Sequence, residues 1–151
     1  MDFVAQAAER VLGIHPRALD ILVPIAGALV PATLNVPLGA RAIVAIFSPS
    51  GRSRYDAPNR FFAQVLEQAG LATLSLDPLE TERSDEATKV VDWLSTESFT
   101  ADLPIGLLAF TPELKLDVTG VAAWLVSPER TARAAELASE LFVQRLLGSS
   151  R

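Results

Sequence analysis

Apolar residues in the first third of the chain come in short runs broken by proline, glycine and polar residues. The runs LDILVPI (19–25) and ALVPATLNV (28–36) predict an antiparallel pair of strands joined by a turn. Pro24 and Pro31 would interrupt a helix here, which argues against a membrane span over residues 21–40. The next run, ARAIVAIFS (40–48), is almost continuously apolar, as expected for a strand covered on both faces.

Elsewhere apolar residues recur at the spacing of an amphipathic helix. Four helices are predicted in this way: over residues 2 to 12, from a cap at Asn59 to Gly70, from near Ser84, and from Ser127 to Gly148. Further strands are predicted at LATLSLD (71–77), LPIGLLAF (103–110) and, with period-two alternation, ELKLDV (113–118).

Strands alternate with helices from residue 40 onward, which indicates a mostly parallel sheet with helices on its faces. We therefore expect one α/β domain over residues 1–151, with an antiparallel strand pair near its N-terminus. An N-terminal amphipathic helix within residues 1–13 and a C-terminal helix over 127–147 complete this arrangement.

The composition restricts the classes of function. Of 151 residues, 50% are hydrophobic and 21% are charged, which is typical of a globular domain with a sizeable core. The net charge of −5 and the lack of a basic block argue against nucleic acid or an anionic membrane as the partner. The chain has no cysteine and one histidine, His15, so we expect neither a metal site nor a cofactor. A cytoplasmic location fits, and Asp2 is unlike the start of a secretory signal.

Two stretches resemble the dienelactone-hydrolase-like members of the α/β-hydrolase superfamily. AIVAIFSPSGRSRYDAPNRFFAQVLEQAGLATLSLDPLETE (42–82) resembles the family's loop H-G-S-G-S-S-R-x-x-P-x-N and the A-G-[LY]-A-T-L strand after it. VVDWLSTESFTADLPIGLLAF (90–110) resembles the next helix and the strand L-P-I-G-Y-F-G. The resemblance covers residues 19 to about 110 and implies a reduced α/β-hydrolase-like three-layer sandwich.

The positions that carry catalysis in this family are changed. Ser48 and Pro49 stand where relatives have His-Gly, and proline has no N–H to face an oxyanion. The nucleophile elbow G-x-S-x-G is matched by AFTPE (109–113), with Thr111 in place of the serine. KLDVTGVAAWLV resembles the last strand and the histidine loop, and Ala123 falls in the histidine's place. The resemblance thus implies an internally shortened hydrolase without the triad, whose members act as a unit.

The loop after the strand at 40–48 is the strongest remaining candidate for a site. Its hydroxyls, amides and two guanidinium groups could bind a small anionic ligand such as a carboxylate or a phosphate. The candidate ligand-binding residues are Ser50, Gly51, Arg52, Ser53 and Arg54. The alternative is an inherited turn whose arginines lie in solvent or pair with Asp56 or Asp77.

Loss of the helix after the nucleophile would leave one face of the apolar strands uncovered, and such a surface usually mediates association. We therefore predict a homodimer or a complex with another protein. The first functional hypothesis is a non-catalytic α/β-hydrolase-like protein that acts through association or ligand binding. The second is a small ester or lactone hydrolase with an unconventional site, for which Thr111, Ser48 and Ser50 are weak candidates.

Overall fold

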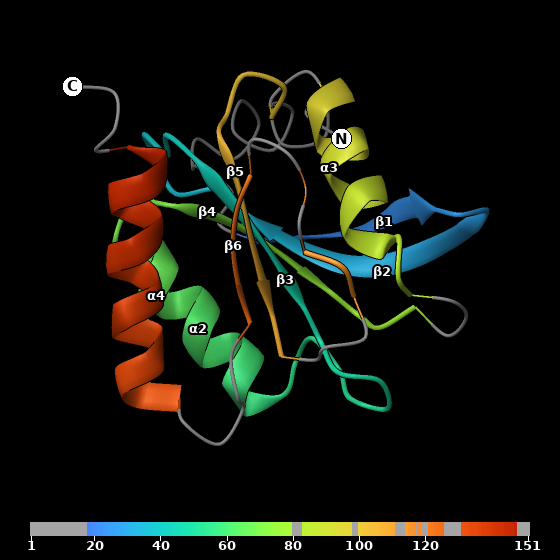
Figure 1. The fold of residues 1–151 in the computed structure, drawn as a ribbon, viewed down its shortest axis with the longest axis horizontal. Helices are drawn as coiled ribbons and strands as arrows, with labels where there is room; N and C mark the ends of the chain where they lie inside the picture. The colour runs from blue at the N-terminus through green and yellow to red at the C-terminus, as the bar shows by residue number, and fades with distance from the viewer. Residues whose placement is uncertain are drawn as a thin grey trace.

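A computed structural model describes residues 18–79, 83–97, 100–110, 114–116, 118, 121–125 and 131–147. Its elements in chain order are β1 (Leu19–Ile25), β2 (Ala28–Asn35), β3 (Ile43–Phe47), α2 (Ala57–Gln68), β4 (Ala72–Leu76), α3 (Glu86–Thr96), β5 (Ile105–Ala109), β6 (Ala122–Leu125) and α4 (Thr131–Leu146). In this part of the chain the strands form one sheet in the order β1-β2-β4-β3-β5-β6, with α2 and α4 on one face and α3 on the other (Figure 1). The predicted three-layer α/β sandwich is confirmed.

The segment rich in proline near the start of the described chain is a hairpin. Strands β1 and β2 pair antiparallel, with Leu22 opposite Pro31 and Val23 opposite Val30. Ala26 and Gly27 connect them with φ angles of 51° and 81°, the combination that a tight two-residue hairpin turn requires. The expected strand pair is therefore confirmed. Among the described helices none is both long enough and apolar enough to cross a membrane.

The central strands are buried on both faces, which explains their continuous apolar sequences. Alternate residues of β3 point to two separate clusters, so that Ile43 and Phe47 pack on the α3 side and Val44 packs on the side of α2 and α4. On the latter side Phe62 and Phe110 meet edge to face with ring centroids 5.1 Å apart. The two faces of the sheet thus hold one core layer each.

Helix α4 rests on β5 at a position that has no side chain. A Cβ atom on Gly106 would lie 2.6 Å from two carbons of the Phe142 ring, closer than carbon atoms pack. Phe142 itself is fully buried. The glycine of the P-I-G motif therefore permits the C-terminal helix to approach the sheet. This helix was expected over 127–147 and is observed at Thr131–Leu146, whereas residues 1–13 lie outside the described part of the chain.

The structure corrects the strand predicted at ELKLDV (113–118). Leu114 forms a bend, and Lys115, Leu116 and Val118 are not in a strand. The amide of Lys115 instead donates to the carbonyl oxygen of Ser84 just before α3, at 3.1 Å. Tertiary contacts therefore override the period-two pattern of this segment.

The prediction of an uncovered sheet face is also wrong for the central strands. On the α3 side Ile43, Ala45 and Leu107 are fully buried. The apolar residues of the segment that was predicted as a strand, together with others nearby, pack against this cluster: Leu114, Leu116, Val118 and Val121. An irregular segment thus covers part of the α3-side face of the sheet.

Candidate functional site

The polar residues singled out from the sequence lie at the carboxyl ends of the parallel strands. The loop from Ser48 to Asp56 leaves β3 and enters α2, and Asp77 directly follows β4. In open α/β sheets, ligands bind outside the carboxyl ends of the strands. This edge is therefore where a site of this fold is expected.

Ser48, the first residue after β3, is fully buried and its hydroxyl is engaged on both sides. It donates to the carbonyl oxygen of Leu76 at 2.9 Å and accepts a short hydrogen bond from the amide of Asn59. Asn59 is itself buried in the first turn of α2. Its predicted role as the helix cap is wrong, because the N-cap is Asp56 and Asn59 instead fastens the helix to β3.

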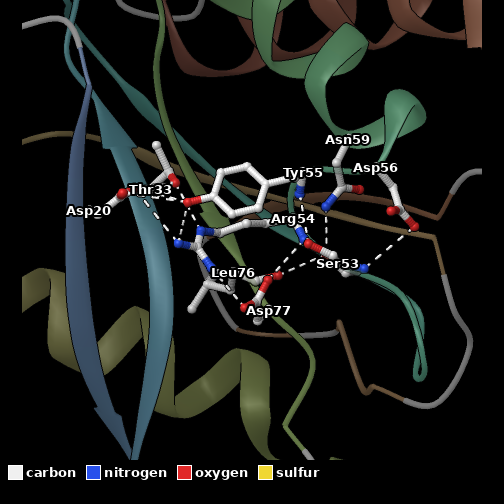
Figure 2. Close-up of polar contacts among 10 residues, drawn as sticks. Asp20, Thr33, Ser53, Arg54, Tyr55, Asp56, Asn59, Leu76 and Asp77 are labelled. Atoms are coloured by element: carbon white, nitrogen blue, oxygen red, sulfur yellow. Dashed lines mark hydrogen bonds and ion pairs between the residues drawn. The ribbon is translucent and has the colours of Figure 1, made fainter.

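Arg54 lies at the centre of the second polar cluster and is 9% exposed (Figure 2). Its Nη1 donates to Asp77 Oδ2 at 2.7 Å, and its Nε donates to the Thr33 hydroxyl at 2.9 Å. Its Nη2 donates to the Tyr55 hydroxyl at 2.7 Å and lies 3.7 Å from Asp20 Oδ1. The backbone amide of Arg54 donates to Asp77 Oδ1 at 2.9 Å. One guanidinium therefore joins the hairpin, the loop and the end of β4.

The other candidate residues of the loop are more exposed. Arg52 pairs with Asp56 at 3.1 Å on the surface. Gly51 has a φ of 78°, and Ser53 accepts a hydrogen bond from the Tyr55 amide at 3.1 Å. The alternative to a binding site was a turn whose arginines pair with Asp56 or Asp77. Both of these ion pairs are observed. Whether Ser50, Gly51, Arg52, Ser53 and Arg54 also bind an anion remains a prediction.

A buried ion pair between Arg83 and Glu86, which was not predicted from the sequence, also holds the loop after β3. Arg83 and Glu86 are 3% and 1% exposed, and Arg83 Nε donates to Glu86 Oε1 at 2.8 Å. Arg83 also donates to the carbonyl oxygen of Ser48 at 2.8 Å and to the Ser50 hydroxyl at 3.2 Å. In the sequence both residues lie in the acidic stretch ETERSDE (80–86), for which no ion pair was predicted. No local signal distinguished them.

A further polar cluster lies at the opposite end of β4, near the end of α2. Glu67 accepts from Asn35 Nδ2 at 3.0 Å and from the Thr73 hydroxyl. Burial raises the pKa of Glu67 above its ordinary value of 4.5, and the hydrogen bond from Thr73 opposes this rise. This carboxylate fastens α2 to β2 and β4.

Of the remaining positions singled out from the sequence, only Ala123 lies within the described residues. Thr111 and His15 lie outside the described residues. Ala123, the position assigned to the family's histidine, lies inside β6 opposite Leu107 rather than in a loop after a strand. Within the described ranges no three His, Cys, Asp or Glu side chains gather as metal ligands would. The described polar groups at the carboxyl edge thus form buried hydrogen-bond networks that hold the loop.

The sheet order and the paired layers of helices are those of the α/β-hydrolase fold. The chain is similar to the dienelactone hydrolase of Anabaena variabilis, with a TM-score of 0.54 and 33% identity over 62% of this chain and 51% of that protein. Est1E of Butyrivibrio proteoclasticus, at 18% identity over 62% of this chain and 40% of that chain, has a TM-score of 0.51 and shares the fold. The chain therefore has the dienelactone-hydrolase-like α/β-hydrolase fold in a reduced form. No protein-family profile matches it.

Sequence comparison adds a relative with a different described activity. A proposed phosphoribosyl transferase of Mycobacterium tuberculosis is 36% identical over an alignment of 118 positions that covers 70% of this chain. The chain spans only 24% of the length of that relative.

Proposed function

We propose that this chain is a non-catalytic α/β-hydrolase-like domain that acts through association with another protein. The observation that carries the proposal is the state of Ser48 at the end of β3. Its buried hydroxyl bonds to Leu76 and Asn59, and its carbonyl oxygen bonds to Arg83. Side chains thus secure the loop that holds oxyanion donors in hydrolases, and Pro49 has no amide hydrogen to donate.

An esterase assay tests the absence of catalysis. We expect the purified chain to turn over no member of a p-nitrophenyl ester panel and to resist labelling by a fluorophosphonate probe. The Anabaena variabilis dienelactone hydrolase is the matched positive control, because it shares the fold. Turnover by this chain that is lost in Ser50→Ala or Thr111→Ala would instead support the ester or lactone hydrolase hypothesis. Such a loss would identify the hydroxyl that acts as the nucleophile.

The Mycobacterium tuberculosis relative supports a class of partner. The matched part is 24% of that protein and corresponds to a chain with a hydrolase fold, so most of the relative lies outside the match. We propose that the partner is a phosphoribosyl transferase domain, in the same or in a separate polypeptide. The relative's name and the shared segment are the support for this step.

A binding measurement with the relative tests this partner. The Mycobacterium tuberculosis protein is prepared without its matched segment and titrated with this chain in a calorimeter. We expect saturable binding of this chain and none of the Anabaena variabilis dienelactone hydrolase, which serves as the control. Equal binding of both proteins, or of neither, contradicts the proposed partner.

A further inference from the structure

The two edges of the described sheet differ in how they are protected. The β1 edge carries the charge of Asp20 and the proline Pro24, both of which discourage pairing with another strand. The β6 edge, Ala122–Leu125, has the sequence AAWL, with neither a charge nor a proline. Strand β6 pairs only with β5 in the described sheet. Its outer side thus offers backbone N–H and C=O groups to a further strand.

The α3-side face of β6 is apolar and open to solvent. Ala123 and Leu125 are in register with Leu107 and Ala109, which belong to the cluster on the α3 side. Residues in register on neighbouring strands point to the same face. Ala123 is exposed and Leu125 is 49% exposed on this side. This edge therefore exposes apolar side chains on a face where the central strands are buried.

Helix α4 extends the apolar surface on the other side of the sheet. Its stripe of Ala135, Ala138 and Phe142 is fully buried against the sheet. A second stripe lies beside it at positions 134, 137 and 141, where Leu137 is 37% exposed. The flank opposite to this second stripe holds Ser139, which is buried.

The position of α2 decides which way the second stripe faces. Helix α4 contacts β5 and β6, whereas α2 contacts β3 and β4, so α2 lies on the flank of α4 that is away from the β6 edge. Because a flank that packs against another helix is buried, we assign the flank with Ser139 to the α2 side. Leu137 and Leu141 therefore face outward on the side of the β6 edge.

We propose that a second copy of this chain docks on this surface, with the two β6 strands antiparallel about a two-fold axis. An open strand edge is complemented by a strand, and an antiparallel pair of identical strands complements itself in a closed dimer. A stable interface needs about 800 Å² from each partner, more than a four-residue strand supplies. The outward stripes of the two α4 helices, with Leu125, provide the additional apolar area. The dimer deepens the proposed role in association and does not depend on the class of partner.

The test is the mass in solution, measured by light scattering after gel filtration. We expect the native chain to have twice its monomer mass of 16.2 kDa. Leu125→Lys and Leu137→Lys each place a charge in the interface and should weaken the dimer by at least about tenfold, to give monomers at micromolar concentration. Leu22→Lys is the matched control, because Leu22 is 51% exposed on the protected β1 edge. This control should remain dimeric.

The outcomes separate the dimer from the other proposals. A native chain at 16.2 kDa, or an assembly larger than a dimer, overturns the inference. So does a dimer that survives both Leu125→Lys and Leu137→Lys, or one that Leu22→Lys abolishes. Circular dichroism verifies that each variant folds. Leu125 and Leu137 lie on separate elements, so the test of the dimer can be made even if only one of the two variants folds. The esterase result is independent of the mass.

Discussion

Arg54 contributes to stability through partners on three parts of the chain, whereas Arg52 has one exposed partner. Removal of the Arg54 side chain leaves Asp77 without its 2.7 Å ion pair and the Thr33 hydroxyl without a donor. We expect Arg54→Ala to lower the free energy of unfolding by roughly 2 to 3 kcal/mol, because a partly buried carboxylate loses its countercharge. Arg52→Ala should cost less than about 0.5 kcal/mol, since the pair is exposed. Urea unfolding measures both changes.

The same pair of variants bears on the predicted anion site. If the loop binds phosphate through its arginines, phosphate should raise the midpoint of thermal unfolding of the native chain. Arg52→Ala, which should keep the fold because its ion pair is exposed, should abolish that rise. An equal rise in the native chain and in Arg52→Ala would exclude Arg52 as a ligand.

Glu67 makes the stability depend on pH in a direction opposite to that of an ordinary ion-paired carboxylate. Its pKa is raised in the folded chain, so the folded state binds more protons than the unfolded state above pH 4.5. Its contribution to the free energy of unfolding is thus present below 4.5 and is lost as pH rises through the folded pKa. Glu67→Gln cannot ionise, so its stability relative to the native chain should improve as pH rises from 4.5.

Urea unfolding over a pH series measures this effect, with Glu140→Gln on the exposed surface of α4 as the control. A difference between Glu67→Gln and the native chain that stays constant across the series would contradict the assignment.

At the scale of elements, most strands and helices follow from the sequence because their patterns agree with their final burial. The hairpin was predictable since prolines exclude a helix there, and β3 because its whole sequence is apolar. The segment near Leu114 was not predictable, since its alternation is satisfied by packing beside α3 rather than by strand pairing. Asn59 was assigned as a cap because its partner Ser48 is distant along the chain.

The candidate site shows the same division. The pairing of Arg54 with Asp77 was among the alternatives, since both residues lie at the carboxyl ends of strands that are neighbours in the predicted fold. The hydrogen bonds of Thr33, Tyr55 and Arg83 depend on the positions of the hairpin and of α3 relative to the loop after β3. A single sequence contains no pattern that specifies such contacts.

The contact between β5 and α4 provides a prediction for packing between elements. Gly106→Ala introduces a Cβ atom 2.6 Å from the buried Phe142 ring, so it should lower the free energy of unfolding by about 1 to 3 kcal/mol. The smaller side chain of Phe142→Leu should reduce the clash. In a double-mutant cycle measured by urea unfolding, the cost of Gly106→Ala should therefore be smaller in the Phe142→Leu background. An unchanged cost would show that the ring is not what Gly106 accommodates.

At the scale of the whole molecule, an irregular segment and α3 together cover one face of the central strands. This arrangement separates the core, which is closed in the described chain, from the β6 edge, which is open. A reduced fold can thus be stable as a domain while it keeps an apolar surface for association. The two properties are carried by different residues and can be altered separately.

Leu114 tests whether the irregular segment belongs to the core. It is 6% exposed and packs in the cluster on the α3 side. We expect Leu114→Ala to lower the free energy of unfolding by about 2 to 3 kcal/mol, because a buried cavity replaces the side chain. Leu29→Ala on the hairpin, where Leu29 is 64% exposed, should change it by less than about 0.5 kcal/mol. Equal and small effects of the two changes, measured by urea unfolding, would mean that the irregular segment does not contribute to the core.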